Sequence, residues 1–107
     1  MVIPELHKPA DHRFVDVAED EGSVAGYVDW SVEPLRERGT INLLAVTPAF
    51  RGGHIGRELC EHAIRGMKAL GAKIVEIGTG GDPFHARALY ESLGCTLIPV
   101  AVYFREL

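Results

Sequence analysis

The sequence has few cysteines, no excess of positive charge and no long apolar run, and each absence excludes a class of protein. Only two cysteines occur in 107 residues, and both Cys60 and Cys95 fall within apolar patterns, where a free cysteine behaves as a small buried hydrophobic residue. The formal net charge of −4 argues against nucleic acid or an acidic membrane as a partner. No stretch reaches the roughly 18 apolar residues of a membrane span, and no charged leader precedes one. We therefore expect a cytoplasmic protein.

Metal-ligand patterns and nucleotide-binding motifs are also missing. His7, His12 and His62 are scattered without metal-ligand spacing, so the sequence predicts no metal site. There is no Lys-Ser/Thr of a P-loop and no G-x-G-x-x-G turn of a dinucleotide fold. The chain does have material for a core, because 47% of its residues are hydrophobic and its length is typical of one domain. We expect residues 1–107 to form that domain.

Apolar periodicity predicts alternating strands and helices. The expected elements are a hairpin of strands 14–18 and 24–32, a strand at 40–46, a helix at 55–70, a strand at 73–79, a helix between Asp82 and Gly94, and β structure at 96–100 and 102–107. In the second strand, Val24 is expected on the same face as Val28 and Trp30, with Ala25 on the other. The order β-β-β-α-β-α-β indicates an α+β fold whose mixed sheet pairs strands 40–46 and 73–79 in parallel through a right-handed connection.

The junction between strand 40–46 and the helix that follows has the composition of an anion-binding site. A helix start leaves its first amide hydrogens unpaired and carries partial positive charge, so these N–H groups can converge on a phosphate. Glycines at 52, 53 and 56 let a ligand approach the backbone closely, and arginines at 51 and 57 can add charge-assisted hydrogen bonds. The expected ligand group is a pyrophosphate.

Two segments at this junction and beyond it carry a resemblance to a known family. Residues 51–56, Arg-Gly-Gly-His-Ile-Gly, resemble the acyl-CoA signature Arg/Gln-x-x-Gly-x-Gly/Ala of the GNAT superfamily of N-acyltransferases, with His54 at a position where the family usually has glycine. This histidine either donates to a phosphate or simply tolerates the turn. Residues 86–95, Ala-Arg-Ala-Leu-Tyr-Glu-Ser-Leu-Gly-Cys, look like the family's A-x-x-L-Y-E-x-x-G-F helix. The match covers the chain from about Phe14 onward.

The resemblance implies a GNAT-like sheet whose parallel strands splay apart to admit the pantetheine arm of acetyl-CoA, with no metal. The chain is identified as a short member that lacks the family's opening strand and the two helices after it, a region that commonly roofs the acceptor site. The residues expected to bind the cofactor, by backbone or side chain, are Leu44, Ala45, Val46, Arg51, Gly52, Gly53, His54, Ile55, Gly56 and Arg57.

Acyl transfer to an amine needs a proton for the departing thiolate and a base for the amine. By the resemblance, Tyr90 matches the tyrosine that acts as general acid beside the CoA sulfur; on periodicity alone, it is also a core-facing residue. The base is not readable, and the candidates are Asp29, Glu33, Glu76, Asp82 and His85. The last two also fit a helix-capping cluster.

Two functions from different classes fit the sequence. The first is an N-acetyltransferase that moves an acetyl group from acetyl-CoA to a primary amine by direct transfer in a ternary complex, with a small molecule or a peptide as acceptor. The second is a CoA-binding module without turnover, completed by another protein. A cysteine nucleophile is disfavoured because neither cysteine has an activating base beside it in sequence. A homodimer across the C-terminal strand is also compatible with the pattern.

Overall fold

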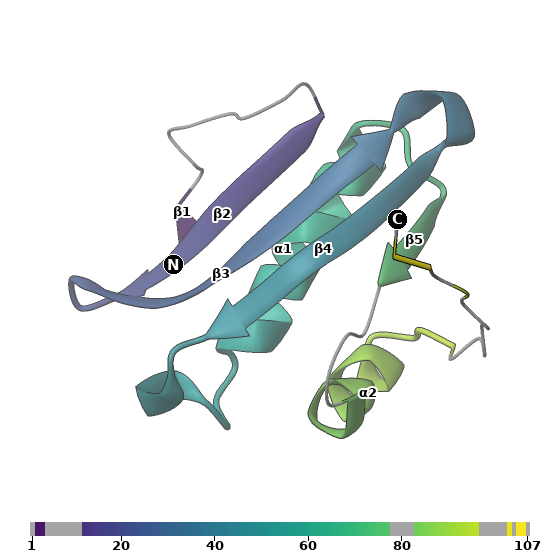
Figure 1. The fold of residues 1–107 in the computed structure, drawn as a ribbon. Coiled ribbons are helices and arrows are strands. Elements are labelled where there is room, and N and C mark those ends of the chain that lie inside the picture. Colours follow the sequence, from purple (N-terminus) through teal and green to yellow (C-terminus); the bar gives the residue numbers. More distant parts are fainter. Residues whose placement is uncertain (1, 4–11, 78–82, 97–102, 104, 107) are drawn as a thin grey trace.

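The protein is described from a computed structural model that covers residues 2–3, 12–77, 83–96, 103, 105 and 106. One sheet has the strand order β1-β2-β3-β4-β5, with one long helix against one of its faces and a shorter helix beside the ends of β4 and β5 (Figure 1). The elements are β1 (Val2–Ile3), β2 (Arg13–Asp20), β3 (Ser23–Glu33), β4 (Arg38–Val46), α1 (Ile55–Ala69), β5 (Ile74–Ile77) and α2 (Pro83–Ser92), with 3-10 turns η1 (Pro34–Arg36) and η2 (Pro48–Phe50). The predicted α+β mixed sheet is confirmed.

The strand β1 was not predicted. It pairs antiparallel with the far side of β2, placing Val2 beside Ala18. The expectation that the opening strand is missing is therefore wrong, although the strand is only two residues long. A segment this short has no periodicity that a sequence pattern can reveal.

The predicted hairpin of β2 and β3 is confirmed and is longer than expected. Its two-residue turn, Glu21 and Gly22, has positive φ at both positions, as a type I′ turn requires. The register shifts between Ala18 and Glu19, so Ala25 of β3 has no partner in β2. This bulge reverses the alternation, which leaves Val24 58% exposed and Ala25 fully buried. The predicted faces of these two residues are therefore wrong.

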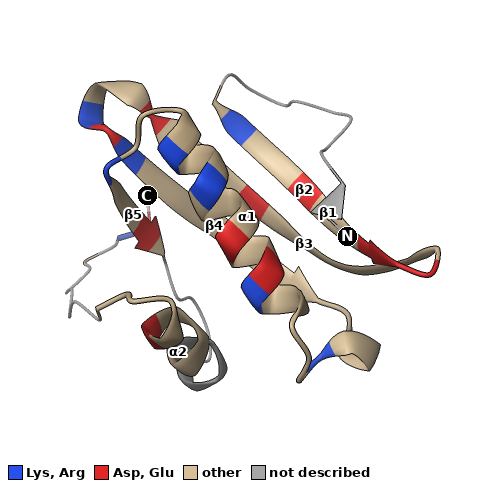
Figure 2. Cartoon of the chain, turned by 180° about the vertical axis from the view of Figure 1, so that it is seen from behind, with Lys and Arg blue, Asp and Glu red and all other residues tan. Residues whose placement is uncertain are grey.

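The core lies between the sheet and α1. Leu59, Cys60, Ala63 and Met67 of the helix are fully buried against Val28, Trp30, Val32 and Ile41 of the sheet. Two glycines allow this close packing, because a methyl group on Gly66 would lie 2.6 Å from the Trp30 ring and one on Gly39 would lie 2.3 Å from the Met67 sulfur. The charged residues of α1 lie on its opposite side, turned away from the sheet (Figure 2). The predicted amphipathic helix is confirmed.

The elements after α1 also follow the sequence pattern. Gly71 ends the helix with φ 94°, and β5 runs parallel to β4 as predicted. Gly94 follows α2 with φ 87°, which matches its expected place beyond the helix end. Asp82, the predicted cap of α2, lies outside the described residues, as do 97–102, 104 and 107. The described part of the predicted C-terminal β structure, residues 96, 103, 105 and 106, is not in a strand.

Candidate active site at the β4–α1 junction

The strands β4 and β5 pair in parallel next to the candidate site. The pairing runs from Arg38 beside Ile74 to Ile41 beside Ile77, where the described part of β5 ends. Within the described ranges, residues 42–46 of β4 pair with β3 on one side. An unpaired strand edge can hydrogen-bond an extended ligand as a neighbouring strand would. Leu44, Ala45 and Val46 lie on this segment.

The backbone turns from β4 into α1 through η2 and a loop of residues 51–54. The Arg51 amide donates to the Pro48 carbonyl at 3.3 Å, and Gly52 adopts φ 82°, a left-handed conformation that favours glycine. The first amide of the helix with a backbone acceptor is that of Glu58, which donates to the His54 carbonyl at 2.9 Å. Within the described ranges, the amides of residues 52–57 have no hydrogen-bond partner. They form a run of free donors at the positive end of α1.

The two arginine side chains beside this loop already make hydrogen bonds within the protein. Arg51 Nε donates to the Val46 carbonyl at 3.2 Å, and His54 is exposed and makes no capping hydrogen bond. Arg57 is turned along α1, where Nε pairs with Glu61 at 3.0 Å and Nη1 donates to Ser92 Oγ at 2.9 Å. In this structure Arg57 ties α1 to the last turn of α2. Contact of Arg51 and Arg57 with a phosphate stays a prediction.

The helix α2 brings Tyr90 toward the junction. A methyl group on Gly56 would lie 3.6 Å from Val46 Cγ2 and 3.5 Å from Leu89 Cδ2, so the residue before Tyr90 packs where β4 ends and α1 begins. Burial raises the pKa of the Tyr90 phenol, and the neighbouring Cys60 and Cys95 thiols raise it further. A phenol in this state stays protonated at neutral pH and is able to donate a proton.

Cys60 has the opposite character to a nucleophile. It is fully buried, and burial raises the pKa of its thiol to about 11. The thiol therefore stays protonated near neutral pH, whereas a reactive cysteine needs its thiolate. The structure agrees with the expectation that Cys60 is a packing residue.

The carboxylates proposed as general base are held by arginines. Asp29 pairs with Arg13 at 2.7 Å, and this hydrogen bond lowers the pKa of the carboxyl, which makes it a weaker base. Arg38 bridges Glu33 at 3.2 Å and Glu76 at 3.1 Å. Asp82 and the side chain of His85 lie outside the described residues.

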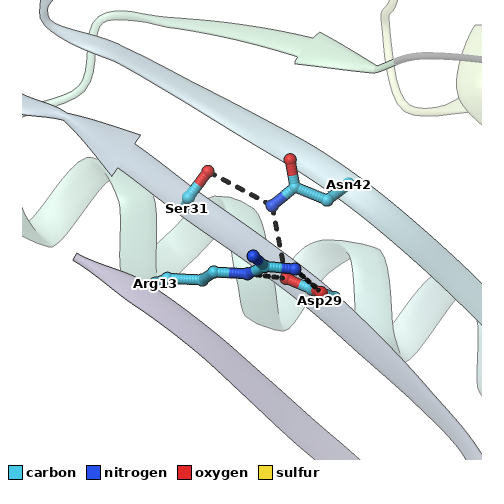
Figure 3. Close-up of polar contacts among 4 residues, drawn as sticks. All are labelled: Arg13, Asp29, Ser31 and Asn42. Carbon is cyan, nitrogen blue, oxygen red and sulfur yellow. Dashed lines mark hydrogen bonds and ion pairs between the residues drawn. The ribbon is translucent and has the colours of Figure 1, made fainter. Parts of the chain in front are cut away.

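A polar network on the sheet face opposite α1 was not predicted. Asp29 accepts hydrogen bonds from both Arg13 and Asn42, and Asn42 also lies 3.2 Å from Ser31 Oγ (Figure 3). Asn42 stands at a second bulge, because Asp29 is beside Leu43 while Trp30 is beside Ile41. Arg13 and Asp29 are 16 residues apart, and their pairing depends on the register of β2 and β3, which no local pattern reveals.

A shallow depression of about 440 Å³ lies on the outer side of the loop. It shares Arg51, Gly53, His54 and Ile55 with the predicted cofactor site, but Asp20 and Glu58 also line it. These carboxylates would repel a diphosphate. The amides of residues 52–57 are therefore a better match to a diphosphate than this depression.

Neither a metal centre nor a membrane helix is found where the structure describes the chain. Across the described ranges, no group of three or more His, Cys, Asp or Glu side chains is arranged to hold a metal ion. No helix in the same ranges is long and apolar enough to cross a membrane.

Comparison with known proteins places this geometry in a family. The model of the acetyltransferase (GNAT) family matches residues 2–95. Over 74 residues the chain is 39% identical to a mycothiol acetyltransferase of Beutenbergia cavernae, covering 69% of this chain and 24% of that protein. Over 87 residues it is 35% identical to an uncharacterized N-acetyltransferase of Archaeoglobus fulgidus, covering 77% of this chain and 59% of that protein.

Solved structures share the fold. An aminoglycoside N-acetyltransferase in complex with CoA superposes with a TM-score of 0.80 at 18% identity, covering 92% of this chain and 78% of that one. A glucosamine-6-phosphate N-acetyltransferase from Arabidopsis thaliana gives 0.72 at 25% identity, covering 89% and 69%. This chain spans less than two thirds of the length of each sequence relative named above. The family model, however, matches most of this chain. The chain therefore belongs to the GNAT family of acetyltransferases.

Proposed function

We propose that this protein transfers an acetyl group from acetyl-CoA to a primary amine. The observation that carries the proposal is the run of amides at residues 52–57 without a described hydrogen-bond partner, which follows directly on the end of β4 at the start of α1. The diphosphate of CoA binds the amides at the start of α1. The pantetheine arm lies along the β4 edge, where it takes the place of a neighbouring strand.

The transfer is direct. The free amine attacks the thioester carbonyl carbon, the new C–N bond forms, and the C–S bond breaks. The amine nitrogen loses its proton to water, and the CoA thiolate takes a proton from the Tyr90 hydroxyl, which water then restores. The raised pKa of Tyr90 keeps the phenol protonated across the neutral range, so the proton is present when the thiolate leaves. Backbone amides on β4 polarise the thioester carbonyl.

Replacement of Tyr90 tests the proton donor. Tyr90→Phe keeps the ring that packs against the core and removes only the hydroxyl, so we expect kcat to fall about 100- to 10,000-fold while the Kd for acetyl-CoA stays within about twofold. Stopped assays of released CoA thiol and calorimetry measure the two quantities. Equal loss of turnover and binding would instead assign Tyr90 a packing role. Cys95→Ser, beside the same ring, is the control and should leave kcat nearly unchanged.

A CoA-binding module without turnover remains the second candidate, since the chain spans only part of its relatives' length. The two functions separate in one experiment. Acetyl-CoA is added to the protein with a broad panel of amines, and both the melting temperature and the released thiol are measured. A rise in melting temperature with no thiol release from any amine would favour the module. Stabilisation by ATP or NAD in place of acetyl-CoA would contradict both.

A further inference from the structure

The network around Asp29 occupies the face of the sheet that α1 leaves uncovered. No described element lies over this face of β2, β3 and β4 (Figure 1), and α1 lies behind the network in Figure 3. Asp29 itself is buried, with Arg13 Nε at 3.2 Å and Asn42 Nδ2 at 3.2 Å from Oδ1, and Arg13 Nη2 at 2.7 Å from Oδ2. Both carboxylate oxygens are satisfied. Asp29 therefore organises its neighbours and has little capacity left to bind a ligand itself.

The Asp29 carboxylate also fixes the orientation of Asn42. An ionised carboxylate only accepts hydrogen bonds, so Asn42 must present its NH₂ group to it. The pKa of Asp29 is lowered by Arg13, which keeps the carboxylate in this accepting form. The Asn42 carbonyl oxygen Oδ1 consequently points away from Asp29, and no partner for it is found among the described residues.

Arg13 offers the complementary group. Its Nε and Nη2 atoms are committed to Asp29, while Nη1 has no partner among the described residues. The side chain as a whole is 49% exposed. The network thus presents one hydrogen-bond acceptor and one guanidinium donor whose charge is paired with Asp29, and both side chains are anchored on that buried carboxylate.

The position of the network relative to the proposed cofactor is the third observation. Asn42 follows Ile41, the last β4 residue whose pairing with β5 lies within the described chain. It lies four residues before Val46, which corresponds to about 13 Å along a strand. An extended phosphopantetheine arm that starts at the loop after Val46 can span this length. Because α1 covers the opposite face, an acceptor reaches the thioester from the face that carries the network.

We propose that Arg13 and Asn42 bind the acceptor, and that the acceptor is an amine with a carboxylate close to its amino group. This inference rests on the proposed acetyl transfer. Asn42 Oδ1 accepts a hydrogen bond from the amine, and Arg13 Nη1 donates to the carboxylate as a charge-assisted bond. Asp29 is a positioning residue that holds both side chains in place.

The charges around the network favour an acceptor with one amino group over a polycation with several. A polycation would need several unpaired carboxylates near the thioester. Asp29 is neutralised by Arg13, and Glu33 and Glu76 are both bound to Arg38. This chain therefore lacks, in the part that the structure describes, the negative surface that a substrate with several amino groups would require.

The test compares matched acceptors in the wild type and in Arg13→Gln. Each α-amino acid is paired with its own carboxamide, and kcat/KM is measured for both with saturating acetyl-CoA. The wild type should prefer the carboxylate form, and the preference should drop at least about tenfold in Arg13→Gln through a higher KM for the amino acid only. The change in ratio is the readout, because the different basicity of the two amines affects both enzymes equally. Arg36→Gln removes an exposed arginine outside the network and should leave the ratio unchanged.

Two further variants keep the inference testable if Arg13→Gln folds poorly. Asn42→Ala should raise KM for amino acids and carboxamides alike by several-fold, because the amine contact is common to both. Asp29→Asn should do the same and also weaken the carboxylate preference, since it releases both side chains. Thermal unfolding confirms that each variant is folded before its kinetics are compared.

The outcomes separate the two proposals. Turnover of other amines, with an unchanged carboxamide-to-carboxylate ratio in Arg13→Gln and an unchanged KM in Asn42→Ala, would overturn the acceptor site and leave the acetyltransferase assignment intact. Acetyl-CoA binding without turnover of any amine would overturn the proposed transfer and the acceptor site together.

Discussion

The two faces of the sheet are built differently, and the difference separates what holds the fold from what is available for chemistry. The face toward α1 is dry and closely packed, with Leu59 and Met67 fully buried and Gly66 pressed against the Trp30 ring. The opposite face carries no described element and is more polar, with Leu43 51% exposed beside the buried Asp29. Stability should therefore respond strongly to changes on the first face, and activity to changes on the second.

The largest expected effect is the loss of a core leucine. Leu59→Ala removes a fully buried side chain and leaves a cavity, so the free energy of unfolding should fall by about 2–5 kcal/mol. Leu43→Ala removes the same atoms from the exposed face and should change stability by at most about 0.5 kcal/mol. Urea denaturation of both variants measures the contrast. Similar losses would show that the second face is also a core, covered by a part of the chain or by a partner.

A smaller loss is expected from Gly66→Ala. Alanine favours a helix over glycine by about 1 kcal/mol, but its methyl group would lie 2.6 Å from the Trp30 ring. The ring cannot move freely, because Trp30 Nε1 donates to the buried Asp16 at 2.7 Å. We expect a net loss of about 1–3 kcal/mol from overpacking. A gain in stability, measured by the same denaturation, would mean that α1 can shift away from the sheet.

The smallest effect concerns the open face and depends on pH. The hydrogen bond from Arg13 lowers the pKa of Asp29 below its ordinary value of 3.8, so the folded state favours the carboxylate. The ion pair therefore contributes fully to the free energy of unfolding when the pH is above the ordinary pKa of Asp29. This contribution is lost as the pH falls through the lower pKa of the folded state. The stability difference between wild type and Asp29→Asn should be constant from about pH 5 to 8 and shrink below about pH 4. Urea titrations across this range test it, and a difference that is independent of pH would contradict the ion pair.

Patterns along the chain predicted most of the fold because they report local preferences. The periodicity of α1, the positive φ of Gly71 and the parallel pairing of β5 all follow from composition and spacing. The burial of Ala25 in place of Val24 could not be predicted, since it depends on a bulge set by the neighbouring strand. Register between strands is a tertiary property, and a shift of one residue exchanges the two faces.

The features of the candidate site also fall into two groups, those that a local sequence pattern predicted and those that depend on contacts between distant segments. The glycine-bearing loop at residues 51–56 was predicted from its composition, and Tyr90 of α2 was predicted from the family resemblance. The roles of both stay predictions. The bond from Arg57 to Ser92 has no signature in the sequence. It arises from a contact between segments far apart in the chain, which spacing does not encode. The Asp29 network belongs to this second group.

The central claim is that the backbone entering α1 binds the diphosphate of CoA. Isothermal titration calorimetry with CoA and with pantetheine, which lacks the diphosphate, tests it directly. The account predicts saturable binding of CoA in the micromolar range and binding of pantetheine at least about 100-fold weaker, the loss expected when charge-assisted hydrogen bonds to two phosphates are removed. Equal affinities, or no saturable signal with millimolar CoA, would contradict it.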